Sequence, residues 1–175
     1  MKNTTLIKDA NTTFDFKQLK ITSSVFHHEE NIPFKYSCDG SNTNPPLDID
    51  EIPLGAKSLA IIFENRDNPS GAWAHWVVWN IPIMDHIKEY GMHGTEGMND
   101  FHQLRYIGPT PSFDTNRYAF KIYALDSLLY LPPNTTKAEL EKAMIEHIIA
   151  YGELVGLYKN NLAHSYQKDN IAHNN

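Results

Sequence analysis

Polar side chains that could bind a small ligand are concentrated in one stretch, which holds Asn65, Asp67 and His75 beside Trp73 and Trp76. A carboxylate accepts hydrogen bonds, an amide donates and accepts them, and an imidazole can gain a proton near neutral pH. The stretch therefore predicts a small polar pocket with aromatic walls at the rim of a β core. The alternative interpretation is an ordinary turn followed by a hydrogen-bonded core histidine.

Two apolar segments must position these side chains. Residues 59–63 form an unbroken apolar run, which favours a buried strand over residues 58–64. Residues 73–80 follow the polar loop and predict a second strand. Because side chains alternate along a strand, the odd-numbered residues, among them His75, are expected on one face and the even-numbered ones, among them Trp76, on the other.

The rest of the chain predicts more strands and one helix. Further strands are expected at residues 19–26, 32–36, 117–125 and 153–158, and a surface loop at 38–47. A helix is expected at 136–151, because Thr136 and Glu139 form a capping box and an apolar stripe that includes His147 follows at helical spacing. Gly152 would end this helix. Many short strands and one late helix predict a mostly β protein, a β-sandwich with an added C-terminal helix.

Composition limits the class of protein. The chain is 41% hydrophobic and contains eight Phe, nine Tyr and three Trp, which is typical of a single globular domain. A formal charge of -6 argues against nucleic acid and anionic membrane surfaces as partners. No apolar window is long enough for a membrane span, and residues 1–15 lack the apolar segment of a signal peptide. Cys38 is the single cysteine, so we expect a cytoplasmic protein without an internal disulfide.

Two rival chemistries find little support in the residue spacing. The nine histidines show no spacing typical of metal ligands, so neither a metal nor another cofactor is expected. A hydrolase would need an activated nucleophile, and the chain has no Gly-x-Ser-x-Gly elbow. Cys38, His75 and Asp67 could be imagined as a Cys–His–Asp set, although a structural role is the default for Cys38. We therefore expect no enzymatic activity.

Several motifs occur in a familiar order between residues 19 and 159. They are Tyr-Ser-Cys-Asp-Gly at 36–40, Pro-Pro-Leu at 45–47, and the segments 64–69, 73–82, 97–101, 106–109, 117–126 and 146–158. Together they resemble the phosphatidylethanolamine-binding protein (PEBP) family, in its bacterial and archaeal Raf-kinase-inhibitor-like branch. The resemblance implies a β-sandwich of two antiparallel sheets with Greek-key-type connections. It covers the domain at residues 19–159. The Asn-, Thr- and Lys-rich composition of residues 1–18 predicts an irregular lead-in, and the polar, patternless residues 160–175 predict a flexible tail.

The resemblance also implies a pocket that binds a small anion or a phospho-headgroup such as that of phosphatidylethanolamine. Carried over by position, the pocket residues are Asn65, Asp67, Pro69, His75, Gly108, Pro109, Asn116 and Tyr118, with Arg66 and Arg117 beside them. Three positions depart from the family pattern: Asn65 replaces an Asp, Arg66 a Pro, and Asn116 a His.

These departures change the expected chemistry of the pocket. Asn65 removes a negative charge and adds N–H donors, whereas Asn116 cannot become cationic as His can. His75 would then be the main titrating group, and Arg66 would add a cation if it faced the pocket. We expect either altered anion selectivity with weaker pH dependence or a pocket that has lost its ancestral ligand. The resemblance also implies a homodimer and an inhibitor-like interaction with a kinase or protease.

Overall fold

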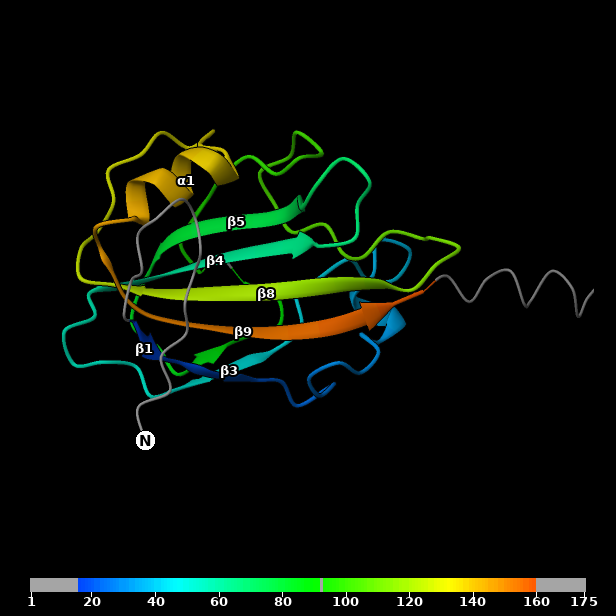
Figure 1. The fold of residues 1–175 in the computed structure, drawn as a ribbon, viewed down its shortest axis with the longest axis horizontal. Coiled ribbons are helices and arrows are strands. Elements are labelled where there is room, and N and C mark those ends of the chain that lie inside the picture. Colours follow the sequence, from blue (N-terminus) through cyan, green and yellow to red (C-terminus); the bar gives the residue numbers. More distant parts are fainter. Residues whose placement is uncertain (1–15, 92, 160–175) are drawn as a thin grey trace, which may run out of the picture.

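The computed structural model describes residues 16–91 and 93–159, which form two β-sheets and one α-helix (Figure 1). A six-stranded sheet has the order β1-β9-β8-β4-β5-β7, and a three-stranded sheet the order β2-β3-β6. The strands are β1 Lys17–Gln18, β2 Lys20–Thr22, β3 Leu47–Asp50, β4 Ser58–Asn65, β5 Trp73–Ile81, β6 His86–Ile87, β7 Thr95–Glu96, β8 Asn116–Leu125 and β9 Ile148–Tyr158; the helix α1 is Lys137–Met144. All pairs are antiparallel except the edge pair β1–β9.

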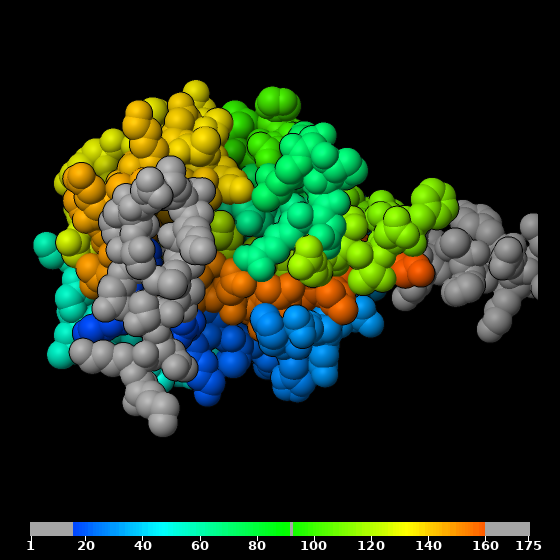
Figure 2. Space-filling model, viewed as in Figure 1, coloured from blue at the N-terminus to red at the C-terminus, as the bar shows by residue number. Residues whose placement is uncertain are grey.

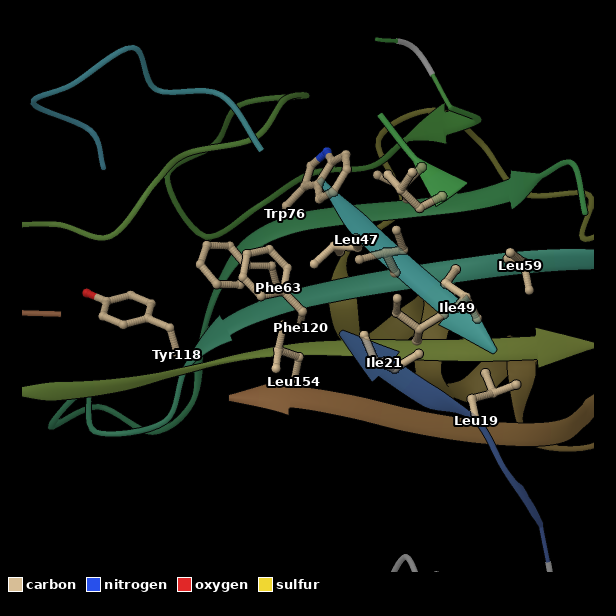
Figure 3. Close-up of a cluster of buried hydrophobic side chains, with 14 of the residues drawn as sticks. Leu19, Ile21, Leu47, Ile49, Leu59, Phe63, Trp76, Tyr118, Phe120 and Leu154 are labelled. Atoms are coloured by element: carbon tan, nitrogen blue, oxygen red, sulfur yellow. The ribbon is translucent and has the colours of Figure 1, made fainter. Parts of the chain in front are cut away.

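The main core lies between the two sheets and confirms the predicted sandwich. Figure 3 shows side chains of the small sheet, such as Leu47 and Ile49, packed against Phe63, Trp76 and Phe120 of the large sheet. All five side chains are at most 2% exposed. Burying aromatic and branched side chains from both sheets provides the main driving force for this packing.

A second apolar cluster covers the opposite face of the large sheet, beneath α1. Leu140 and Met144 of the helix pack with Ile62 of β4, Trp79 of β5 and Tyr151 of β9. The predicted capping box is present: the Thr136 side chain accepts from the Glu139 backbone N–H, and the Glu139 carboxylate accepts from the Thr136 N–H. No helix of the described residues is long and apolar enough to cross a membrane.

The predicted helix is too long. It ends at Met144, and residues 148–151 belong to the long strand β9, where Tyr151 pairs with Tyr123 of β8. Gly152 does not cap the helix but lies inside β9, where a Cβ atom would overlap the carbonyl oxygen of Leu19. His147 follows the helix, half-exposed, with Nδ1 2.9 Å from a carboxylate oxygen of Asp126. The β-branched residues after Met144 gain more from the sheet than from another helical turn.

The N-terminal strand predictions are also partly wrong. Residues 34–36 form a 3-10 turn because Pro33 fixes the backbone and cannot donate to a strand ladder. The segment 19–26 contains only β2, because the chain passes from the large sheet at β1 to the small sheet at β2. Leu47 begins β3 rather than ending a loop. Residues 17–18 of the predicted lead-in form β1; residues 1–15 and the predicted tail lie outside the described residues.

Candidate functional site

Three strands bring the candidate residues together at one end of the large sheet. Asn65, the last residue of β4, pairs with Tyr118 near the start of β8 and with Trp73 at the start of β5. The loops that follow β4 and precede β8 lie side by side at this end (Figure 2), and the Arg66 N–H just after β4 donates to the carbonyl of Arg117 in β8. The arrangement follows from antiparallel pairing, which places the end of β4 beside the start of its neighbours.

A β-bulge turns His75 toward Tyr118. The pairing of β4 with β5 shifts register between Phe63 and Glu64, so two consecutive residues of β5 oppose one position of β4. Trp76 packs in the core between the sheets, and His75 contacts Phe63 and Tyr118 of that same core, with ring centroids 5.6 and 5.2 Å away. The strict alternation predicted from the sequence is therefore wrong at this position.

The orientation and tautomer of His75 are fixed by two backbone carbonyls. Its Nδ1 lies 2.9 Å from the oxygen of Ile107 and 3.1 Å from that of Gly108. Carbonyl oxygens only accept hydrogen bonds, so Nδ1 carries the proton and Nε2 keeps a lone pair in the neutral ring. The side chain is only 1% exposed, and burial lowers its pKa to about 4. His75 is therefore neutral at physiological pH and does not titrate there, contrary to our expectation from the sequence.

This pKa predicts a loss of stability in mild acid. The unfolded chain takes up the proton near pH 6.5 and the native state only near pH 4, so stability falls as the pH is lowered through this window. At about 1.4 kcal/mol per pKa unit, the expected contribution is about 3 kcal/mol. Urea titrations at several pH values measure the free energy of unfolding of the wild type and of His75→Asn. The carboxylates contribute equally to the two proteins, so the difference in pH dependence reports on His75. Equal pH dependence in the two proteins would contradict the assignment.

The hydroxyl of Tyr118 and the side-chain amides of Asn65 and Asn116 form the polar part of the site. The Tyr118 hydroxyl oxygen lies 3.4 Å from the Asn65 amide nitrogen and 3.3 Å from the Thr110 N–H. The Asn65 amide is oriented by the Asp67 N–H, which donates to its oxygen at 2.9 Å. Burial raises the pKa of Tyr118, opposed in part by hydrogen bonding with Thr110 and Asn116. The hydroxyl thus remains protonated, and Figure 3 shows it pointing away from the apolar core.

Both arginines near the site are occupied by carboxylates. Arg117 forms a two-pronged ion pair with Asp67, whose pKa is lowered chiefly by this hydrogen bond. Arg66 pairs with Glu153, with nitrogen–oxygen distances of 3.0 and 2.5 Å. The Tyr151 hydroxyl donates to Glu153, and Tyr151 belongs to the second apolar cluster, beneath α1. Arg66 therefore faces that side of the sheet, away from His75. Each guanidinium is therefore balanced by a carboxylate.

The other predicted residues have supporting positions. The Gly108 N–H donates to Asn42 at 2.7 Å, and a Cβ at Gly108 would overlap the backbone of Tyr36 and Ser37. The Pro109 carbonyl accepts from the Cys38 N–H, whereas Pro69 lies exposed in the loop after β4. The structure therefore brings together Asn65, His75, Gly108, Pro109, Asn116 and Tyr118, but not Pro69 or Arg66.

Asn99 is the most important residue that the sequence analysis did not assign to the site. Its amide group donates to the carbonyls of His75 and Arg105 and accepts from the N–H groups of Phe101 and Gln103. This holds a loop across the site, and the Phe101 ring lies 4.9 Å from that of His75. The motif 97–101 was recognised in the sequence, but only the fold places it against β5.

The geometry does not form the imagined Cys–His–Asp set. The Asp67 carboxylate binds Arg117, and the His75 nitrogen that an aspartate would orient is bound to carbonyls instead. Burial is the main cause that raises the pKa of Cys38, so it remains a thiol. Within residues 16–91 and 93–159, no group of three or more His, Cys, Asp or Glu side chains is arranged to hold a metal ion.

Comparison with known proteins decides the family. A sequence profile described as "Phosphatidylethanolamine-binding protein" matches residues 22–159. The chain belongs to the phosphatidylethanolamine-binding protein family. A UPF0098 protein of Pyrococcus abyssi is 47% identical over 148 residues, which is 78% of this chain and 83% of that protein. A UPF0098 protein of Chlamydia muridarum is 39% identical over 148 residues, covering 81% of this chain and 99% of that protein.

Solved PEBP structures share the fold. The crystal structure of a PEBP homolog, CT736, from Chlamydia trachomatis has a TM-score of 0.78 and 37% sequence identity, covering 82% of this chain and 99% of that one. YbcL of E. coli, described as a member of the mammalian PEBP family, has a TM-score of 0.74 and 25% identity over the same shares. The predicted family and sandwich fold are therefore confirmed.

Proposed function

We propose that the chain is a non-catalytic, cytoplasmic protein that binds a small anion or phospho-headgroup, with His75, Tyr118, Asn65 and Asn116 as its contacts. The observation that carries the proposal is the convergence of these polar side chains from three strands beside the rings of Phe63, Phe101 and Tyr118. Membership of a family described by phosphatidylethanolamine binding supports a ligand with a phosphate group.

The electrostatics favour a ligand of low charge. With Arg66 and Arg117 paired, the ligand would be held by the neutral donors of Tyr118, Asn65 and Asn116. Hydrogen bonds from neutral donors in a partly desolvated site give orientation, with a net contribution of about 1 kcal/mol each. The replacements at positions 65 and 116 thus retune the site toward hydrogen bonding in place of charge pairing.

The hydroxyl of Tyr118 provides the direct test. Tyr118→Phe is expected to weaken binding of O-phosphoethanolamine by roughly 10-fold, because one donor is lost. Tyr123→Phe is the matched control: it removes a hydroxyl from the opposite face of the same strand and should leave affinity unchanged. Isothermal titration calorimetry at pH 6 measures both variants. Wild-type affinity in Tyr118→Phe would argue against the proposed contact.

The proposal includes the protein interactions that the family resemblance implies, a kinase or protease partner and a homodimer. Exposed apolar side chains offer candidate contacts, with Leu54, Phe113 and Tyr130 more than 90% exposed. Phe113 lies in the loop before β8, at the same end of the sheet as the site. If wild type gives no heat with phosphate, acetate or phosphoethanolamine, the alternative of a site without its ancestral ligand stands.

A further inference from the structure

The hydrogen-bonding role of His75 toward a ligand is set by its backbone contacts. Since Nδ1 donates to the carbonyls of Ile107 and Gly108, a ligand can meet only Nε2. No hydrogen bond joins Nε2 to the described residues. In the neutral ring this nitrogen accepts a hydrogen bond and cannot donate one. The ligand atom that faces Nε2 must therefore carry a hydrogen.

Tyr118 has the complementary role. Its oxygen already receives the Thr110 N–H at 3.3 Å and the Asn65 amide at 3.4 Å. Its own hydrogen has the Thr110 carbonyl as a weak acceptor, at a long 3.5 Å. The hydroxyl is therefore best placed to donate to a ligand oxygen. The two rings pack edge to face, at 84° with centroids 5.2 Å apart, so the two side chains are direct neighbours.

The charged and titratable groups around His75 do not supply a proton. From β8 the neighbour is the neutral phenol of Tyr118, with the Cys38 thiol beyond it. From the loop after β7, the Asp100 carboxylate favours a positive His75 but is bound to the Ala74 N–H at 2.6 Å. At the rim, Asp67 and Arg117 neutralise each other. Burial outweighs the effect of Asp100, and the imidazole stays neutral.

Resting on the proposed function, the geometry points to a site that selects oxyacids carrying an O–H group. The O–H of the acid donates to His75 Nε2, and a second oxygen accepts from the Tyr118 hydroxyl. A phosphomonoester fulfils both roles as its monoanion. A phosphate oxygen of the dianion or of any phosphodiester, including the intact lipid headgroup, lacks the hydrogen and faces Nε2 lone pair to lone pair. An unpaired polar contact in a buried site weakens binding on the order of 10- to 100-fold.

The test compares two ligands that share an ethanolamine group, on the wild-type protein from pH 5.5 to 8. O-Phosphoethanolamine is a monoester, and glycerophosphoethanolamine is a diester with the phosphatidylethanolamine headgroup. At pH 5.5 both carry one negative charge on phosphate, and the monoester should bind at least roughly 10-fold more tightly. Its association constant should fall roughly 10-fold per pH unit above about pH 6, where phosphomonoesters lose their second proton. The weaker diester affinity should be constant.

The controls separate this inference from the proposed function. Dimethyl phosphate, a smaller diester, tests whether bulk rather than the missing O–H weakens the diester. His75→Asn keeps a donor for the two carbonyls but removes Nε2, and should abolish the monoester preference. Equal affinities, or a diester affinity that rises in acid because His75 gains the proton, would overturn the inference and leave the proposed function standing. If neither ester binds at any pH, both are wrong.

Discussion

Asn99→Ala is expected to lower the free energy of unfolding by about 4 kcal/mol, at about 1 kcal/mol for each of four lost hydrogen bonds. The side chain is 2% exposed, so water cannot replace the partners. The substitution removes the hydrogen-bond partner of two carbonyls and two N–H groups. These groups belong to the loop that carries Phe101 and to the backbone of His75. We therefore also expect phosphoethanolamine binding to weaken at least roughly 10-fold.

Urea denaturation and calorimetry measure the two effects. Asn68→Ala is a suitable control, because Asn68 lies in the loop after β4 and accepts one exposed hydrogen bond, from the Ser70 N–H. Its cost should stay within about 1 kcal/mol. If Asn99→Ala costs no more than this control, the loop is held by its apolar contacts rather than by the amide.

Glu64→Ala is expected to cost about 4 kcal/mol through a different mechanism. Glu64 lies on the face of the sheet opposite His75, with its side chain 6% exposed, and pairs with Lys121 at 3.5 Å and Lys137 at 2.5 Å. Lys137 is the first residue of α1, so the pair ties the helix to the sheet. Removing one partner of a buried ion pair leaves the other charges uncompensated.

Glu141→Ala tests whether burial is the cause. Glu141 contacts the same two lysines, at 3.5 and 4.0 Å, but its side chain is 40% exposed. Water and salt screen such a pair, and the expected cost is within about 1 kcal/mol. The comparison by thermal and urea unfolding would contradict our account if both glutamates cost the same. Neither variant should change ligand affinity, because both lie on the far face.

The sequence alone determined the strands whose residues show a strong pattern. The apolar run of β4 and the alternation of β8 are local properties, and their observed bounds differ from prediction by a residue at one end. The capping box of α1 was also predicted correctly, because it depends only on two residues that are three positions apart in the chain, Thr136 and Glu139. The motif order identified the family, and it supplied most of the residues that we propose for the site. These features depend on neighbours in the chain.

Only the tertiary structure decided how the residues of the candidate site are arranged. A bulge between β4 and β5 turned His75 toward Tyr118, and bulges depend on the register between strands rather than on one strand's sequence. Glu153 forms an ion pair with Arg66, and Asp67 forms one with Arg117. Two backbone carbonyls determine the tautomer of His75. Helix α1 stopped early because residues 148–151 pair with β8. Each outcome depends on burial and on partners distant in sequence, which a local pattern does not specify.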